Sequence, residues 1–141
     1  MSKNVKIRKG ANIKLEGVAE KTTIETIMPS SFALKPTDFH GLVPKMLLKE
    51  GDEVKVGTPV FFNKADERIK FVSPVNGEIA EIVRGAKRKI LEIRIVADKE
   101  QKIVAGNPTD MSNGDKIKEA LLANGFWPFI KRRPYDIMAK P

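Results

Sequence analysis

The sequence predicts a mainly β protein, in which short strands form a small two-layer sandwich and a helix follows them. Short apolar runs alternate with polar residues through the middle of the chain, and the turn-forming pairs Gly51-Asp52 and Asn76-Gly77 lie between them. After Asp98 the apolar spacing becomes helical. We therefore expect three regions: N-terminal strands with an irregular connection (1–42), the sandwich domain (43–97), and a helix with the start of a further region (98–141).

The first region is expected to add strands to an edge of the sandwich. Apolar and charged residues alternate over 5–9 and 13–15, which is typical of short half-buried strands. Thr22–Met28 is rich in threonine and isoleucine, which favour strands, and Pro29 then interrupts the pattern. Prolines and glycine recur from 34 to 44 and indicate an irregular connection.

Six strands are expected in the sandwich domain. In the last of them Leu91, Ile93 and Ile95 alternate with Glu92 and Arg94, so one face of the sheet would be buried and the other wet. Glycines lie between the candidates, where tight turns are easiest. The six predicted strands are 46–48, 53–56, 60–62, 69–72, 78–83 and 89–96.

A single helix is expected near the C-terminal end. Ser112 or Asn113 can cap its first turn, and Asp115 would lie at the positive end of the helix dipole. Asn124-Gly125 is a typical helix stop. The apolar cluster 126–130 is expected to dock the helix, and the tail after it shows no finished element.

Composition excludes several classes of function. The chain has 141 residues and no cysteine, so cysteine-ligated iron–sulfur clusters, Cys-type zinc sites and thiol nucleophiles are excluded. No apolar run approaches the roughly 20 residues of a membrane-spanning helix. The N-terminal residues lack a signal-peptide pattern, and we expect a soluble protein that faces the cytoplasm. No phosphate-cradling glycine motif is present.

No residue is assigned a catalytic, cofactor-binding or metal-binding role. His40 is the only histidine, and neither a second histidine nor a cysteine accompanies it as a metal ligand. We interpret His40 as a surface or hydrogen-bonded histidine. The acidic pairs Asp52-Glu53 and Asp66-Glu67, with Asp98 and Glu100, are interpreted as turn and solubility residues.

The spacing of Gly51–Pro59 and of Pro74–Gly77 resembles that of lipoyl and biotinyl carrier domains, whose fold is a barrel-sandwich hybrid. In those carriers a lysine at the tip of a hairpin holds the swinging cofactor. Counting from Gly57 to Pro74 places residues 65–68 at the tip, with Asp66-Glu67-Arg68 at its apex. The same count puts Lys64 and Lys70 on the strands. We interpret the sandwich domain as a barrel of this type that carries no prosthetic group. A carrier domain modified on Lys64 or Lys70 is the alternative.

Two basic clusters raise the alternative of nucleic-acid binding, in keeping with a net charge of +8. Arg84 with 87–89 has no aromatic residue beside it for base stacking. The cluster 131–133 follows aromatic residues that are expected to dock the helix. We interpret both clusters as solvated faces or contacts with other subunits and expect no nucleic acid.

Several segments, taken in order, resemble the N-terminal region of the A subunit of the sodium-translocating NADH:quinone oxidoreductase family. The similarity extends over essentially the whole chain. The segments that carry it are Val5–Gly10, Met46–Phe61, Ser73–Ile79, Arg84–Arg88, Leu121–Trp127 and Arg133–Asp136.

The resemblance implies a role in a respiratory electron-transport complex. Such a complex oxidises NADH, passes electrons through FAD, FMN and iron–sulfur centres to ubiquinone, and transports sodium across a bacterial inner membrane. The A subunit is a peripheral member on the cytoplasmic face without a covalent redox cofactor, and it is linked to the quinone end. The family's A subunit is much longer, so we expect an N-terminal piece that contacts other subunits, reaches the membrane only through them and has no catalytic activity alone.

Overall fold

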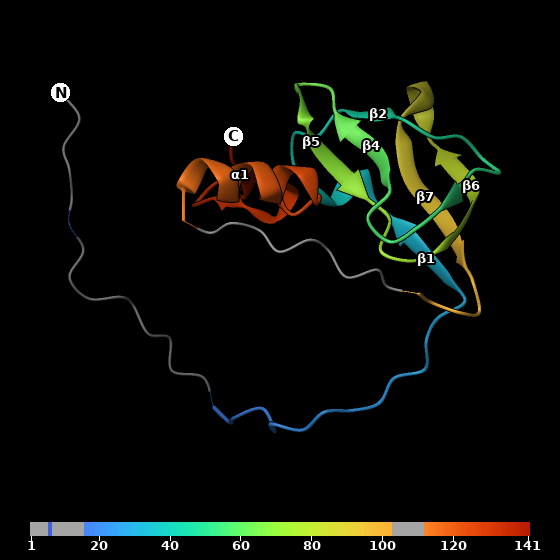
Figure 1. Ribbon diagram of the computed structural model, residues 1–141, viewed down its shortest axis with the longest axis horizontal. Coiled ribbons are helices and arrows are strands. Elements are labelled where there is room, and N and C mark those ends of the chain that lie inside the picture. Colours follow the sequence, from blue (N-terminus) through green and yellow to red (C-terminus); the bar gives the residue numbers. More distant parts are fainter. Residues whose placement is uncertain (1–5, 7–15, 103–111) are drawn as a thin grey trace.

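The computed structural model describes residues 6, 16–102 and 112–141. Figure 1 shows a sandwich of strands, a helix beside it, and a long extended segment that leads into the first strand. The strands predicted over 5–9 and 13–15 lie, apart from Lys6, outside the described residues.

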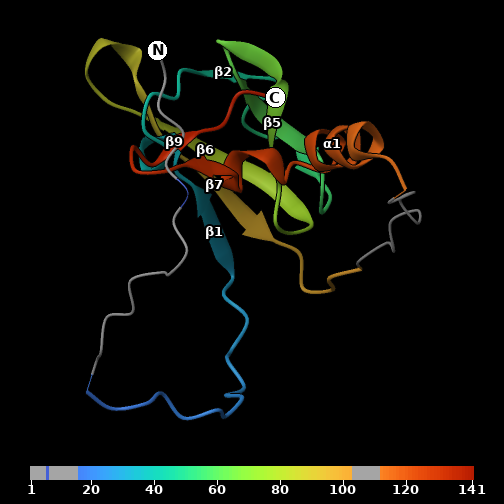
Figure 2. The same ribbon diagram turned by 90° about the vertical axis from the view of Figure 1, so that its left-hand side faces the viewer.

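Two antiparallel sheets form the sandwich, as the mainly β prediction requires (Figures 1 and 2). The first has the order β1-β7-β6-β3 and the second the order β2-β4-β5. The first sheet comprises β1 (Ser31–Leu34), β7 (Ile90–Ala97), β6 (Gly77–Arg84) and β3 (Glu53–Val54). The second comprises β2 (Pro44–Met46), β4 (Pro59–Asn63) and β5 (Asp66–Val72).

The hydrophobic core lies between these sheets. Phe61, Ile79, Ile93 and Ile95 are all less than 2% exposed. The rings of Phe61 and Phe71 stack with their centroids 4.5 Å apart. The predicted burial of Ile93 and Ile95 on one face of the last strand is therefore confirmed, because alternate residues of a strand share a face.

The same strand corrects the prediction for Leu91. Leu91 is 38% exposed, whereas its neighbour Ile90 is 7% exposed and belongs to the core. The register between β6 and β7 shifts by one residue here, since Val83 pairs with Glu92 and Arg84 pairs with Ile90. Such a bulge inserts an unpaired residue and reverses the faces beyond it.

The strand predicted over Thr22–Met28 is wrong. These residues are exposed and belong to no strand, and the first strand, β1, instead begins at Ser31, where a break was expected. β1 pairs with β7, from Ser31 opposite Val96 to Leu34 opposite Ile93. β-propensity measures how well side chains fit a paired surface, and no described strand pairs with 22–28.

The predicted helix is confirmed as α1 (Gly114–Ala123). The Asn113 side chain caps it by accepting a 2.9 Å hydrogen bond from the backbone N–H of Asp115. After Asn124, Gly125 has φ +72°, the left-handed conformation that ends many helices. A Cβ at Gly125 would also collide with the Val72 side chain, so this glycine allows the segment to approach β5.

The tail after α1 does contain a finished element, contrary to expectation. A 3-10 turn, η3 (Trp127–Phe129), leads into a hairpin of β8 (Lys131–Arg132) and β9 (Ile137–Met138). The Trp127 indole N–H donates a 2.9 Å hydrogen bond to the Ala139 carbonyl. Trp127 and Pro128 are buried, as the docking prediction requires, whereas Phe126 and Phe129 are 58% and 69% exposed.

Candidate functional site

The β4–β5 hairpin ends in a two-residue turn made of Lys64 and Ala65. Lys64 is exposed at the tip, and its backbone N–H donates to the Val43 carbonyl at 2.8 Å. The Asn63 side chain accepts from the Ala65 N–H at 3.1 Å and fixes the turn. The placement of the tip at Asp66-Glu67-Arg68 is therefore wrong, because β5 already begins at Asp66.

The prediction for Lys70 is confirmed, since it lies within β5 opposite Phe62. An ion pair on the same strand holds the start of β5. Arg68 Nε and Nη2 donate to the two Asp66 carboxylate oxygens at 2.9 and 2.7 Å. These hydrogen bonds, followed by the charge of the guanidinium, lower the pKa of Asp66 and raise the pKa of Arg68. Both side chains are solvent-accessible, so the pair orders the strand more than it stabilises the fold.

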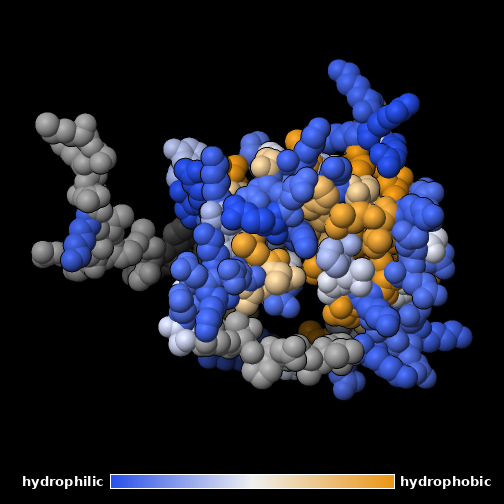
Figure 3. All heavy atoms as spheres, turned by 45° about the horizontal axis from the view of Figure 1, so that its top comes forward, coloured by the Kyte–Doolittle hydropathy of each residue, from blue (hydrophilic) through white to orange (hydrophobic). Residues whose placement is uncertain are grey.

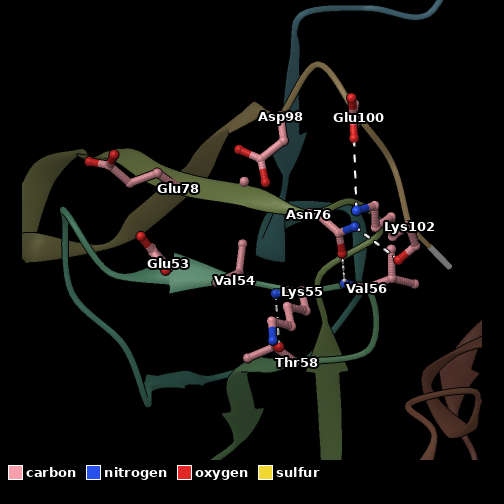
Figure 4. Close-up of a pocket in the computed structure, with 11 residues that line it drawn as sticks. Glu53, Val54, Lys55, Val56, Thr58, Asn76, Glu78, Asp98, Glu100 and Lys102 are labelled. Atoms are coloured by element: carbon pink, nitrogen blue, oxygen red, sulfur yellow. Dashed lines mark hydrogen bonds and ion pairs between the residues drawn. The ribbon is translucent and has the colours of Figure 1, made fainter. Parts of the chain in front are cut away.

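A second candidate is the pocket beside β3, of about 890 Å³, shown in Figure 4. Asn76 forms its floor and is only 9% exposed. The Asn76 side-chain oxygen accepts from the Val56 N–H at 2.8 Å, and its amide nitrogen donates to the Lys102 carbonyl at 3.0 Å. Its backbone N–H donates to the Gln101 side chain at 2.8 Å. Asn76 thus ties three segments together, which is a structural role.

The rim of this pocket carries mixed charge. Glu53, Glu78, Asp98 and Glu100 lie around it together with Lys55 and Lys102 (Figure 4). Among the described residues, no group of three or more acidic or histidine side chains is placed to hold a metal ion. Asp52 lies in a turn, where it accepts a 2.9 Å hydrogen bond from the Lys49 N–H, and Asp98 and Glu100 follow the end of β7. The interpretation as turn residues is wrong for Glu53, which begins β3, and for Asp66-Glu67, which begin β5.

A third candidate site contains His40 and part of the first basic cluster, Arg84 with 87–89. A pocket of about 530 Å³, the basic pocket, lies between the connection after β1 and the β6–β7 turn. Thr37 and His40 line one side, and Arg84, Arg88 and Lys89 line the other. These residues are more than forty positions apart in sequence, and no spacing motif links them. Sequence reasoning treated His40 and the cluster separately for that reason.

The second basic cluster is placed differently. The Lys131 ammonium lies 3.6 Å from the Asp136 carboxylate and 5.2 Å from the centre of the Phe39 ring. Lys131 is therefore partly neutralised by a carboxylate and packed over an aromatic face. Arg132 and Arg133 are exposed beside it. None of the residues 131–133 lines the basic pocket.

An apolar groove of about 530 Å³ separates the sandwich from the C-terminal segment. Phe39 and Phe71 meet edge-on with their centroids 4.8 Å apart, and Phe129 approaches Phe39 at 6.1 Å. Phe126 completes the groove. On the face that Figure 3 displays, apolar residues gather in an area bordered by hydrophilic ones. The groove can accept an apolar group.

The extended segment before β1 exposes several large apolar side chains. Val18 is 91% exposed, Ile24 79%, Ile27 96% and Met28 58%. We refer to residues 16–29 as the arm; it runs away from the sandwich in Figures 1 and 2. Sequence reasoning assigned Thr22–Met28 to a strand of this fold and so missed a free surface. The signal that was present is its alternating, β-branched composition.

Among the described residues, no helix has the length and apolar character needed to cross a membrane.

Comparison with known proteins identifies relatives of this chain. Residues 5–98 match the model of a family described as the NqrA N-terminal barrel-sandwich hybrid domain. The chain is 30% identical over 135 residues to the A subunit of the Na(+)-translocating NADH-quinone reductase of Marinomonas sp. (strain MWYL1), which covers 93% of this chain and 30% of that protein. The same subunit of Alcanivorax borkumensis is 32% identical over 142 residues, covering 97% of this chain and 32% of that protein.

The corresponding subunit of Neisseria meningitidis (strain Z2491) is 31% identical over 136 residues, or 94% of this chain. The chain spans about 30% of the length of these relatives. The family match covers both sheets of the sandwich and more than half of the chain. The chain therefore belongs to the family of the NqrA N-terminal barrel-sandwich hybrid domain.

Proposed function

We propose that this chain is an interaction module of a sodium-translocating NADH:quinone reductase, and that it binds other subunits of that complex without performing chemistry itself. Family membership supports this proposal, because the relatives are named as the A subunit of such a reductase. The exposed arm is the single observation that carries it. A module of this kind would serve assembly and lie near the quinone end of the complex.

The arm has the properties of a strand that lacks its partner. Its residues 22–28 favour strand structure, and its aliphatic side chains are largely in water. It continues directly into β1, the edge strand of the four-stranded sheet. An exposed edge with free backbone groups is a template for pairing with another chain, and such pairing would bury one face of the arm. In a strand, that face would hold Ile24 and Met28.

A binding experiment tests this proposal. The other subunits of the reductase, purified without their own A subunit, are incubated with the wild-type chain, and the amount retained is measured over a concentration series. Replacing Ile24 and Met28 together by Asn removes two side chains whose full burial contributes about 1.5–3 kcal/mol each. We expect the dissociation constant to rise about a hundredfold or more.

The matched control replaces Thr22 and Thr23 together by Asn, which introduces the same side chains into the same segment without removing apolar surface. This control should bind as the wild type does. Equal binding of the two double variants would rule out the arm as the contact. A wild-type chain that is not retained at all would contradict the proposed function itself.

We also propose that the chain carries no flavin, metal or quinone of its own and is held at the cytoplasmic face of the bacterial inner membrane through its partner subunits. Among the described residues, no group of three or more possible metal ligands is gathered at one site, and the pocket beside β3 is lined by Asn76, whose side chain already forms hydrogen bonds within the protein. The purified chain should show no flavin absorbance and should not oxidise NADH. Bound flavin in a purified sample would contradict this.

A carrier role is a second candidate, and the position of Lys64 favours it. Lys64 occupies the exposed turn of the β4–β5 hairpin, where a swinging arm needs its attachment point. The chain would be expressed with a lipoate or biotin ligase and its intact mass measured. Modification should disappear in Lys64→Arg and persist in Lys70→Arg, because Lys70 lies within β5. An unmodified wild-type mass would exclude this candidate.

A further inference from the structure

We propose that the basic pocket binds a phosphate group carried by a small molecule or a lipid. This inference does not depend on the proposed function, because it concerns a different surface from the arm. The pocket brings Arg84, Arg88 and Lys89 from the β6–β7 turn opposite Thr37 and His40. Nothing in the family match assigns a ligand to these residues.

The charge of the pocket is the first argument. None of the residues that line it is acidic. Within the described part of the chain, Arg84, Arg88 and Lys89 form no ion pair, whereas Arg68 and Arg94 each pair with a carboxylate. Three cations around one concave site repel one another and raise the local potential. An anion in the pocket would relieve this repulsion.

The backbone of the turn is the second argument. Lys87 and Arg88 both adopt left-handed conformations, with φ 54° and 60°. This conformation is unfavourable for residues that have a Cβ atom, because the Cβ comes too close to the following carbonyl oxygen. The Gly85 N–H donates to the Lys89 carbonyl at 2.8 Å and closes the turn. Strained turns of this kind occur preferentially at ligand sites, and this one brings Arg88 to the pocket wall.

The shape and donors of the pocket are the third argument. Arginine presents paired N–H groups that match phosphate oxygens, and lysine adds a further charged donor. Thr37 supplies a hydroxyl group and His40 an imidazole ring from the opposite wall. Pro36 and Ile90 are buried and add apolar surface to the lining of the pocket. A volume of about 530 Å³ exceeds that of a bare phosphate ion, so we expect the ligand to carry an organic part.

A phosphate group fits better than a nucleic-acid strand. Base recognition in single strands requires exposed aromatic faces for stacking. Phe39 is the aromatic residue of the pocket, and it is half-buried with its ring packed edge-on against Phe71. The pocket thus offers charge and hydrogen bonds without a stacking platform.

The test is a titration of the isotopically labelled full chain followed by NMR, with inorganic phosphate added against sodium chloride at matched ionic strength. We expect phosphate to shift the backbone signals of Thr37, His40 and Arg88, among others lining the pocket. The variant Arg84→Gln with Arg88→Gln should bind phosphate about tenfold more weakly or worse, since two charge-assisted hydrogen bonds are lost. The variant Arg132→Gln with Arg133→Gln removes the same charge elsewhere and should bind as the wild type does.

A parallel experiment identifies the source of the phosphate group. The same three proteins are sedimented with vesicles of phosphatidylglycerol and, separately, of phosphatidylcholine. Binding to phosphatidylglycerol that is lost only in the Arg84/Arg88 variant assigns a lipid headgroup. Phosphate binding without such vesicle binding assigns a soluble phosphorylated molecule. If neither probe binds, or if the two double variants weaken binding equally, the pocket is not a phosphate site and the proposal is overturned.

Discussion

At the scale of single residues, Gly77 shows how close packing restricts the sequence. It pairs with Ala97 across the first sheet, and a Cβ at this position would collide with the Val96 carbonyl oxygen, which belongs to the backbone. We expect Gly77→Ala to lower the free energy of unfolding by about 1–3 kcal/mol, because the strands must separate to admit a methyl group. Urea denaturation measures this change.

Gly114 provides the control for that measurement. It is the first residue of α1, and a Cβ there meets no atom within 4 Å. Gly114→Ala should leave stability unchanged or raise it by up to about 1 kcal/mol, because alanine has the higher helix propensity. If Gly77→Ala and Gly114→Ala lowered the free energy of unfolding equally, the close contact at Gly77 would not explain the loss.

Lys64 illustrates the limit of counting residues along a hairpin. The register of β4 and β5 shifts twice, between Pro59 and Phe61 and between Phe62 and Asn63. Counting from Gly57 to Pro74 assumes regular pairing, so it placed the tip too far along the chain. The lysine that was assigned to a strand is instead at the turn, and the carrier candidate depends on this correction.

At the scale of elements, β7 combines a buried and a solvent-facing row. Ile93 is fully buried, and Val96 on the same strand is 50% exposed. We expect Ile93→Ala to cost about 2–5 kcal/mol in unfolding free energy, because it removes core contacts and leaves a cavity. Val96→Ala should change it by about 0.5 kcal/mol or less. Thermal or urea unfolding compares the two, and a comparable loss for Val96→Ala would contradict this assignment of faces.

The strands and the helix were predictable to different degrees. The pattern of 114–123, its Asn113 cap and its Gly125 stop are local signals, so the helix could be placed almost to the residue. Strand boundaries depend on partners, which explains why β2 begins at Pro44 and not at Met46. The segment 22–28 has the composition of a strand but finds no partner among the described strands.

At the scale of the whole molecule, the two proposed surfaces lie at opposite ends. The turns 64–65 and 85–89 are at one end of the sandwich, and the arm leaves from the other (Figures 1 and 2). Both surfaces can therefore be occupied together. We expect Arg84→Gln with Arg88→Gln to leave binding to the reductase subunits unchanged, and Ile24→Asn with Met28→Asn to leave phosphate binding unchanged. Equilibrium binding of each variant to each probe measures this, and a crossed effect would show that the two ends are coupled.

The residues of the candidate sites could be found in the sequence, but their arrangement in space could not. The basic cluster, the lone His40 and the apolar residues of the arm are all visible in the sequence. Their spatial relation is not visible in the sequence, because His40 lines the same pocket as Arg84 and Arg88 only when the connection after β1 lies beside the β6–β7 turn.

The sequence by itself determined the helix with its ends and the core face at Ile93 and Ile95, because each depends on spacing within a short stretch of chain. It also determined the fold class and the family, because these follow from several short motifs taken in order along the chain. Tertiary structure alone decided which residue occupies the β4–β5 turn, which strand lies at the sheet edge, and which distant side chains share a pocket. Those outcomes depend on register, bulges and pairing between segments that are far apart in the chain, and neither composition nor periodicity encodes them.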